Sequence, residues 1–229
     1  MRIAGMQKLT LLDYPGKVAC TVFLSGCNLR CPYCHNPDLV LPERAGRAGL
    51  STEDVRKFLE TRMGKLDAVC VSGGEPTCQP DLSDFLTVLR GLPFLIKLDT
   101  NGTNPGMLRN ILRRGLVDYV AMDIKNSRTR YRETCGADVA DQVAESAALL
   151  MAGQVEYEFR TTVCKPFHTP QDMEEIGCWL QGARQYYLQG FVDSGDLVLG
   201  GVQALSAAEM ASLREAVLPW IPSTRIRGE

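Results

Sequence analysis

The sequence predicts an α/β fold, a partial (βα)6 barrel similar to a TIM barrel, with parallel strands inside and helices outside. Short apolar runs alternate with amphipathic segments over most of the 229 residues, which is typical of βα units joined by right-handed crossovers. Several runs are almost continuously hydrophobic, as expected of strands that are covered on both faces. About six such units fit, fewer than the eight of a closed barrel, so an open or partial barrel is predicted.

Six apolar segments rich in Val, Ile, Phe and Tyr are the expected strands. In chain order they are Val18–Leu24, Ala68–Val71, Phe94–Leu98, Val117–Ile124, Val155–Val163 and Tyr186–Val192. In parallel βα units, functional groups gather at the edge where strands run into helices. Residues that directly follow these six runs are therefore the first candidates for a site.

The segments between the strands carry helix start and stop signals. One helix is expected over Ser51–Met63, where a Ser N-cap begins it and the next Gly stops it. Another is expected over Asn104–Gly115, with an Asn N-cap, Pro in the first turn and Gly at the end. Thr169 and Ser206 each begin a sequence that resembles a capping box. No linker, repeat or change of composition divides the chain, so one domain over residues 1–229 is expected.

Composition and charge exclude several classes of protein. Hydrophobic residues make up 45% and charged residues 23%, as in soluble globular proteins. The net charge of −2 argues against a protein that mainly coats nucleic acid or anionic membrane, so neither partner is expected. The apolar stretch after Lys8 is broken at Asp13, which is too early for a signal peptide. A cytoplasmic location is therefore expected.

Nine cysteines against two histidines are the unusual feature of this composition. An odd number cannot pair completely, and cytosolic thiols stay reduced, so a disulfide scaffold is excluded. Cys27, Cys31 and Cys34 follow the first expected strand at a spacing that lets three thiolates converge on one metal or cluster. A structural zinc ion would need a fourth ligand, from His35 or His168. Three thiolates suit a [4Fe–4S] cluster with one iron open to another ligand, and spacing alone leaves both interpretations open.

The segments Asp13–Lys17 and Gly26–Pro37 together resemble the start of a radical S-adenosylmethionine (radical SAM) enzyme. They are similar to the activating proteins of anaerobic ribonucleoside-triphosphate reductase, and more distantly to pyruvate formate-lyase activating enzyme. The resemblance covers nearly the whole chain, because Ser72–Pro76, Asp99–Gly102 and Asp123–Lys125 follow in the order of that family. It implies that the three cysteines are catalytic and hold one [4Fe–4S] cluster, with S-adenosylmethionine as the second cofactor.

The later motifs also have a physical interpretation of their own. The two glycines of Ser72–Pro76 let backbone approach a ligand, and the carboxylate beside them can accept from an ammonium group. Taken alone, this motif is more often an ordinary tight turn. Both signs of charge are expected around the site at the strand ends, from Asp99, Asp123 and Lys125. This arrangement suits a zwitterionic methionine moiety. A single charge at such a position is as readily a solvated one.

The resemblance implies a set of cofactor-binding residues. Those expected to contact S-adenosylmethionine are Tyr33, Cys34, His35, Gly73, Gly74, Glu75, Asp99, Asn101, Asp123, Lys125, Arg160, Thr162 and Gln189. In this set the Gly74 backbone would hold the amino group, and Tyr33 would pack on adenine. The resemblance further suggests that Asp99, Thr100 and Asp123 hold a Na⁺ or K⁺ ion near the carboxylate.

Three expected cofactor-binding residues lie on the last two expected strands: Arg160, Thr162 and Gln189. Arg160 and Thr162 are two residues apart on the fifth strand and therefore share a face. The alternative to their cofactor role is an ion pair of Arg160 with Glu156 or Glu158. Pyruvate formate-lyase activating enzyme has a His on its sixth strand for the ribose, where this chain offers only Gln189.

Two further groups of residues have no assigned chemistry. Core packing is expected of the remaining cysteines, because free Cys behaves as a small hydrophobe, while two of them stand in expected loops and could be reactive. The six are Cys20, Cys70, Cys164 and Cys178, with Cys78 and Cys135 in loops; none has the spacing of a second cluster.

A basic run after the fourth strand is either a solvated loop or a docking patch for a protein partner. Its members are Lys125, Arg128, Arg130 and Arg132.

The resemblance implies a glycyl-radical activase. An electron from a flavodoxin- or ferredoxin-like donor would reduce the cluster, and cleavage of S-adenosylmethionine would give a 5′-deoxyadenosyl radical. That radical would take hydrogen from a glycine of the partner, with anaerobic ribonucleotide reductase expected as that partner. The alternatives are the activase of another glycyl-radical enzyme, a compact radical SAM enzyme like 7-carboxy-7-deazaguanine synthase, and a non-catalytic zinc-binding module.

Overall fold

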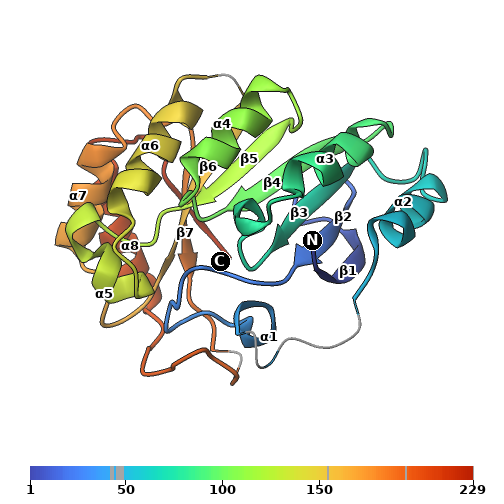
Figure 1. Cartoon of the computed structure of the whole chain (residues 1–229). Coiled ribbons are helices and arrows are strands. Elements are labelled where there is room, and N and C mark those ends of the chain that lie inside the picture. The colour runs from blue at the N-terminus through green and yellow to red at the C-terminus, as the bar shows by residue number, and fades with distance from the viewer. Residues whose placement is uncertain (42–43, 45–48, 154, 194, 229) are drawn as a thin grey trace.

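The computed structural model describes residues 1–41, 44, 49–153, 155–193 and 195–228 (Figure 1). Within these residues one sheet of eight strands runs through the molecule, and strands that follow one another in the chain are also neighbours in the sheet. The strands are β1 (Ile3–Thr10), β2 (Ala19–Leu24), β3 (Ala68–Gly73), β4 (Leu95–Thr100), β5 (Tyr119–Asp123), β6 (Glu156–Val163), β7 (Tyr186–Gly190) and β8 (Arg225–Arg227).

The strands β2 to β7 are parallel and coincide with the six apolar runs of the sequence. The sheet is thus mostly parallel and has helices between its strands, so the prediction of a partial TIM-like barrel is confirmed. In the described residues β1 and β8 are the two edges of the sheet, since each pairs with one neighbour only. The barrel is therefore partial.

The two edge strands were not predicted from the sequence. β1 runs antiparallel to β2, and most of its residues are exposed or half-buried, so it has no apolar run to reveal it. Its pairing with β2 is also irregular on both sides of the Gly5–Gln7 stretch. β8 is three residues long and contributes only Ile226 to the core. An edge strand buries less than a central one, and periodicity therefore identifies it poorly.

Eight α-helices connect the strands in the described part of the chain. They are α1 (Pro37–Val40), α2 (Thr52–Glu60), α3 (Leu82–Arg90), α4 (Pro105–Arg113), α5 (Tyr131–Cys135), α6 (Ala140–Met151), α7 (Pro170–Trp179) and α8 (Ala207–Val217), with 3₁₀ turns at Pro76–Cys78 and Arg128–Arg130. Ser51, Thr169 and Ser206 form complete capping boxes, and the Asn104 side chain caps α4, as predicted. α2 ends at Glu60, earlier than the predicted end at Met63.

The two faces of the sheet carry different side chains. Large apolar residues such as Val22, Val71 and Phe159 pack outward into the main core beneath the helices. The inner face instead carries Ala19, Ala68, Cys70 and Ala121, which form a small cluster with Tyr14 and Tyr119. Those two tyrosine rings lie 5.6 Å apart, near the ends where strands begin. The inner face is thus filled at the start of the strands and leaves room where the strands end.

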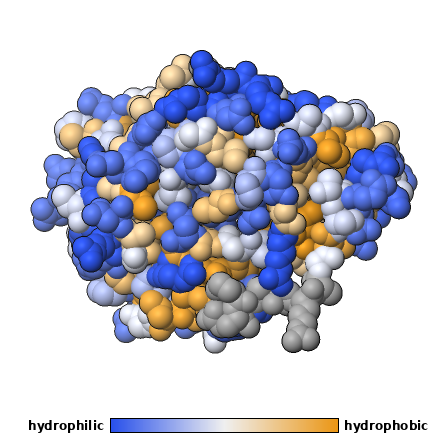
Figure 2. All heavy atoms as spheres, in the orientation of Figure 1, coloured by the Kyte–Doolittle hydropathy of each residue, from blue (hydrophilic) through white to orange (hydrophobic). Residues whose placement is uncertain are grey.

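The edge where the strands end lies at the bottom of Figure 1. Three segments lie below the sheet: α1, the segment after β7, and the loop Cys27–Cys34 before α1, which is called the cysteine loop from here on (Figure 1). The helices α3, α4 and α6 cover the front of the sheet (Figure 1). Figure 2 shows that the helical side of the molecule is largely hydrophilic, as expected of an outer layer. None of the helices in the described residues is long and apolar enough to cross a membrane.

Candidate active site

A cavity of about 150 Å³ lies at the carboxyl edge of the sheet. Its wall comes from the ends of four consecutive strands, β3 to β6, and from the cysteine loop that follows β2. The lining residues that were predicted from the sequence are Cys27, Cys31, Tyr33, Cys34, His35, Gly73, Gly74, Glu75, Asp99, Thr100, Asn101, Asp123, Lys125, Arg160 and Thr162. Gln189 is not among the lining residues, and Leu29, Asn36, Val40 and Ser72 line the cavity without having been predicted.

The cysteine loop is held from two sides by backbone hydrogen bonds. The Arg30 N–H donates to the Cys135 carbonyl at 2.9 Å, which ties the loop to the end of α5. From the segment after β7, the N–H of Val198 donates to the Cys34 carbonyl at 3.1 Å, and the N–H of Leu199 donates to the Pro32 carbonyl at 3.3 Å. The loop is therefore a fixed part of the cavity wall, and segments far apart in the sequence hold it there.

Two of the three cavity thiols, those of Cys27 and Cys31, are hard to ionise in the empty cavity. Burial raises the pKa of Cys27 to about 11 and that of Cys31 to about 12, so both are neutral near pH 7 when nothing is bound. The Cys27 Sγ already accepts hydrogen bonds from the Leu29 N–H at 3.4 Å and from the Asn101 side chain at 3.9 Å. Thiolate ligation with hydrogen-bond donors to sulfur is the donor set of an iron–sulfur cluster.

We expect this pKa shift to be measurable in the metal-free protein. Because the thiolate is the reactive form, alkylation of Cys27 by iodoacetamide should keep rising with pH to about 11 rather than levelling off near the usual ~8.5. Mass spectrometry of the tryptic peptides measures the rate for each cysteine. The exposed Cys178 serves as an accessibility control. A rate at Cys27 that levels off near pH 8.5 would show that burial does not control this thiol.

The loop Gly73–Gly74 packs backbone to backbone against the start of the cysteine loop. A Cβ at Gly73, whose φ is +123°, would lie 2.2 Å from the Leu24 carbonyl oxygen. A Cβ at Gly74 would lie 2.1 Å from the Gly26 carbonyl oxygen. The Gly74 N–H donates to Leu24 O at 2.8 Å. Both glycines are therefore required by this close approach, before any ligand is considered.

A Gly74→Ala substitution tests that packing. Because the new Cβ would meet backbone that cannot turn away, we expect the protein to lose about 3 kcal/mol of unfolding free energy, measured by denaturant titration. Gly5→Ala is the matched control, since a Cβ at Gly5 meets nothing within 4 Å. Equal stability of the two variants would contradict the close approach of the loops.

Glu75 joins two strand ends. Its side chain is 1% exposed. One carboxylate oxygen accepts from the Thr77 N–H at 2.9 Å, from the Thr77 hydroxyl at 2.5 Å and from the Thr100 hydroxyl at 2.7 Å. The other oxygen accepts from the Asn101 N–H at 2.6 Å. The carboxylate is thus used to hold the end of β3 to the end of β4, and the predicted contact with an ammonium group is not what these bonds provide.

Opposite charges alternate across the cavity wall. The Asp123 carboxylate accepts from the Lys125 ammonium at 3.1 Å and from the Arg160 Nε at 2.9 Å. Asp99 pairs with the buried Lys97, and its second oxygen accepts from the Ser72 hydroxyl at 2.9 Å. Burial opposes ionisation of Asp123, but Arg160 and Lys125 outweigh it and lower the pKa of this carboxyl to about 2. Both signs of charge are therefore present and ionised at neutral pH.

These pairs correct one prediction. Arg160 pairs with Asp123, whereas Glu158 pairs with Arg227 and Glu156 with Arg184, so the expected alternative ion pair is wrong. The expected cation ligands Asp99, Thr100 and Asp123 all line the cavity, and the cation site itself stays a prediction.

The Thr100 hydroxyl donates to Glu75 and accepts from the Gly102 N–H at 3.1 Å. Within the described ranges no three His, Cys, Asp or Glu side chains are grouped to hold a single metal ion.

Tyr33 and Gln189 are two further expected cofactor-binding residues. The Tyr33 ring is largely buried, 6.2 Å from the Phe167 ring and 6.1 Å from the His168 ring, and Tyr33 lines the cavity only in part, so its packing on adenine stays a prediction. Gln189 pairs with Thr162 in the sheet register and lies outside the cavity lining. Its predicted ribose contact has no support in this arrangement.

The remaining cysteines agree with expectation only in part. Cys20, Cys70 and Cys164 are buried, as predicted for core residues, and Cys78 is exposed as predicted. Cys178 is exposed, because it lies on the outer side of α7, so core packing was wrong for it. Cys135 is not in a loop: it ends α5, is buried, and its thiol donates to the Tyr131 carbonyl at 3.0 Å.

The basic run is neither a free loop nor an uncompensated patch. Arg128 pairs with Asp141 at 2.7 Å, and Arg130 pairs with Glu133 at 2.7 Å and Asp172 at 2.8 Å. These pairs compensate the charge within the chain, which removes the main reason for a docking patch.

Comparison with known proteins identifies this arrangement. Residues 21–178 match the radical SAM superfamily. The chain belongs to the radical SAM superfamily. This family implies a [4Fe–4S] cluster and S-adenosylmethionine, and the three thiols on one buried loop fit the cluster for the reasons given above.

Several similar proteins are named as activating enzymes. A protein of Methanocaldococcus jannaschii described as a glycyl-radical enzyme activating enzyme is 31% identical over 195 residues, which cover 82% of this chain and 79% of that protein. The pyruvate formate-lyase-activating enzyme of Clostridium pasteurianum is 36% identical over 130 residues, covering 55% of this chain and 52% of that enzyme. The radical SAM protein is thus an enzyme of the glycyl-radical activating class.

Solved structures share the fold at low identity. Streptococcus suis SuiB bound to the precursor peptide SuiA has a TM-score of 0.72 at 15% identity, covering 91% of this chain and 48% of that one. The structure of anSMEcpe with bound AdoMet has a TM-score of 0.66 at 16% identity, covering 89% and 61%. At this level the likeness shows the fold alone.

Proposed function

We propose that this radical SAM protein activates anaerobic ribonucleoside-triphosphate reductase by generating a glycyl radical on it. One observation carries the proposal: three thiols, the two glycines Gly73 and Gly74 and a network of ionised pairs line a single cavity at the carboxyl edge of the sheet. The Methanocaldococcus jannaschii protein supports the reaction class, because the match covers 79% of its length. The choice of partner rests on the similarity of the segments Asp13–Lys17 and Gly26–Pro37 to activators of that reductase.

The residues of the cavity divide the task of binding. Cys27, Cys31 and Cys34 would hold the [4Fe–4S] cluster. The Gly74 backbone, with the ionised pair of Asp123 and Lys125, would hold the methionine end of S-adenosylmethionine. When bound and given one electron by a flavodoxin- or ferredoxin-like donor, the two cofactors supply a 5′-deoxyadenosyl radical that takes hydrogen from a glycine Cα.

The protein's own residues orient the bound ligand and exclude water from the cavity. Arg160 stays protonated beside Asp123, so both ends of a zwitterionic ligand meet an opposite fixed charge. Glu75 keeps the ends of β3 and β4 in register with each other without facing the ligand. The buried Leu29 and Val40 contribute apolar surface to the same wall, which limits access of water. We further propose that residues 1–229 form one domain, because the sheet continues from β1 to β8 without a break in order.

The test is a mixture of reconstituted protein, S-adenosylmethionine, a reductant and the anaerobic reductase, examined by EPR. We expect the doublet of a glycyl radical on the reductase, and its loss when the target glycine is changed to Ala. Cleavage of S-adenosylmethionine without a radical on the reductase would assign the activity to another substrate. Stoichiometric zinc without an iron–sulfur absorbance band would contradict the enzyme itself.

A second candidate rests on one further relative. The 7-carboxy-7-deazaguanine synthase of Neisseria meningitidis is 32% identical over 148 residues, which cover 63% of each chain. A compact enzyme of that kind would act on a small molecule instead of a protein glycine. Mass spectrometry that searches for a deazaguanine product distinguishes the two candidates, since the activase would form none.

A further inference from the structure

Lys125 lines the cavity but lies beyond the end of β5, so no strand pairing fixes its backbone. β5 ends at Asp123, and the last ladder bond runs from the Ile124 N–H to the Arg160 carbonyl at 2.8 Å. The Lys125 N–H donates instead to the Tyr131 hydroxyl at 2.9 Å. The Lys125 carbonyl lies 2.9 Å from the His168 Nε2. Two side chains from outside the strand therefore fix the peptide groups that orient Lys125.

The hydrogen bonds define which nitrogen of His168 carries the proton. Its Nε2 lies 2.9 Å from the Lys125 carbonyl, which can only accept, so Nε2 carries the proton and donates. In the neutral ring Nδ1 then accepts from the Cys164 N–H at 3.1 Å, and the Cys164 carbonyl lies beside it at 3.2 Å. His168 is 4% exposed, and burial lowers the pKa of the imidazole, which keeps the ring in this neutral form.

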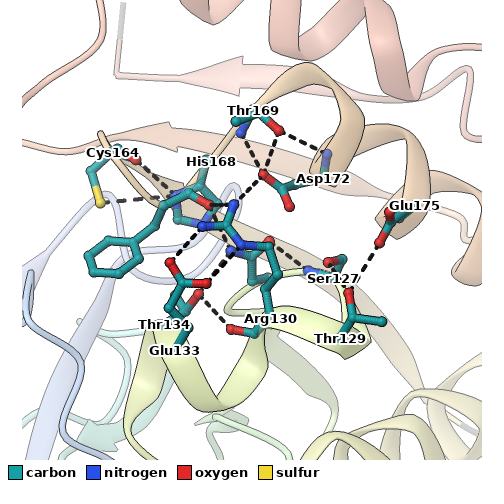
Figure 3. Close-up of polar contacts among 12 residues, drawn as sticks. Ser127, Thr129, Arg130, Glu133, Thr134, Cys164, His168, Thr169, Asp172 and Glu175 are labelled. Atoms are coloured by element: carbon teal, nitrogen blue, oxygen red, sulfur yellow. Dashed lines mark hydrogen bonds and ion pairs between the residues drawn. The ribbon is translucent and has the colours of Figure 1, made fainter.

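A polar network holds His168 in place, as Figure 3 shows. Arg130 donates to the Phe167 carbonyl at 2.9 Å and to Asp172 at 2.8 Å. The Asn126 side chain donates to the same Phe167 carbonyl at 2.8 Å. The turn that carries His168 is thereby fastened to the segment after β5, although 43 residues separate His168 from Lys125.

His168 also contacts the cysteine loop. Its ring meets the edge of the Tyr33 ring at 6.1 Å between centroids, and Tyr33 lies between Cys31 and Cys34. The imidazole therefore touches the loop that carries the thiols and the residue that carries the ammonium. None of the chemistry assigned to the cavity uses His168 itself.

We propose that His168 is a positioning residue that holds Lys125, through its Nε2–H, in the geometry that binds the methionine carboxylate of S-adenosylmethionine. The proposal rests on the proposed function, because it takes S-adenosylmethionine as the ligand of the cavity. His168 acts through the backbone of Lys125 and does not touch the ligand. Its neutral ring spans Cys164 and Lys125, so a side chain that keeps a donor at the Nε2 position preserves the effect.

The test compares His168→Phe with His168→Gln in the reconstituted protein, with S-adenosylmethionine binding measured by equilibrium dialysis. The Phe variant should bind the cofactor about tenfold more weakly, since one buried hydrogen bond is lost. The Gln variant, which retains an amide donor, should stay within about twofold of the unchanged protein. Glu175→Gln is the matched control, because Glu175 contacts Thr129 in the same network and does not touch Lys125.

A double-mutant cycle separates positioning from a general loss of structure. In a Lys125→Met background, His168→Phe should cause no further loss of cofactor affinity. A full additional loss in that background, or equal weakening by Phe and Gln, would overturn the proposal.

A second readout does not depend on the cofactor. Amide hydrogen exchange over residues 124–131 should accelerate in His168→Phe and not in His168→Gln, both measured without S-adenosylmethionine. If the unchanged protein fails to bind S-adenosylmethionine, the proposed function is wrong, and the exchange rates still decide whether His168 holds Lys125. Unchanged exchange in the Phe variant would overturn the positioning role.

Discussion

Cys31→Ala is expected to abolish cleavage of S-adenosylmethionine while leaving the protein folded. Cys31 is one of only three thiols on the cavity loop, and a cluster left with two thiolate ligands is not retained. We expect the absorbance of the iron–sulfur cluster to be lost on reconstitution, and the yield of 5′-deoxyadenosine to fall at least a thousandfold, or about 4 kcal/mol in activation free energy. Chromatography of the products and iron analysis measure both.

The fold of this variant should change little. Cys31 is buried against the core, but the substitution removes a single sulfur atom, so we expect a loss of about 1 kcal/mol in unfolding free energy. Cys178→Ala is the control, because Cys178 is exposed on α7 and far from the cavity lining. Retained 5′-deoxyadenosine formation in Cys31→Ala would remove the cluster assignment, whereas the same loss in Cys178→Ala would show that the assay reports general damage.

Glu75→Ala is expected to destabilise the protein by about 3–5 kcal/mol, the range for breaking a buried, fully bonded charged group. The substitution leaves the Asn101 N–H and the hydroxyls of Thr77 and Thr100 without their acceptor. Denaturant titration measures the unfolding free energy. The substitution also removes the bonds that hold the end of β3 to the end of β4. Cofactor binding should therefore weaken as the unfolding free energy falls.

Two variants sharpen this prediction. Glu174→Ala, an exposed carboxylate on α7, should stay within about 0.5 kcal/mol of the unchanged protein. Glu75→Gln should be intermediate, since an amide oxygen keeps the contacts with the threonines while its NH₂ group faces the Asn101 N–H. A Glu75→Ala protein as stable as Glu174→Ala would show that Glu75 does not join the strands.

The central fold could be predicted from the sequence because the strands from β2 to β6 are largely buried on both faces, and β7 is buried on one face and half-buried on the other. Burial on both faces produces continuous apolar runs, and the caps at Ser51, Asn104, Thr169 and Ser206 mark the helix starts directly. The edge strand β1 lacked this signal, since its exposed face carries polar residues. The exposed Cys178 was missed because a helical cysteine gives no sign of which side it faces.

The cavity residues could be predicted because motif order and strand ends bring them to one edge. Their individual roles could not. Whether the Glu75 carboxylate faces a ligand or Asn101 depends on how closely β3 and β4 end, which local sequence does not define. The role of His168 depends on a contact with Lys125 across 43 residues. The run from Arg128 to Arg132 looked unpaired because Asp141 and Asp172 lie outside its local window.

The bonds from the segment after β7 to the cysteine loop have a consequence for biosynthesis. Val198 and Leu199 leave the ribosome long after Pro32 and Cys34, when nearly all of the sheet has been made. Until then the cysteine loop lacks the backbone bonds that come from Val198 and Leu199. A chain truncated before Val198 would therefore present its three cavity cysteines without this support.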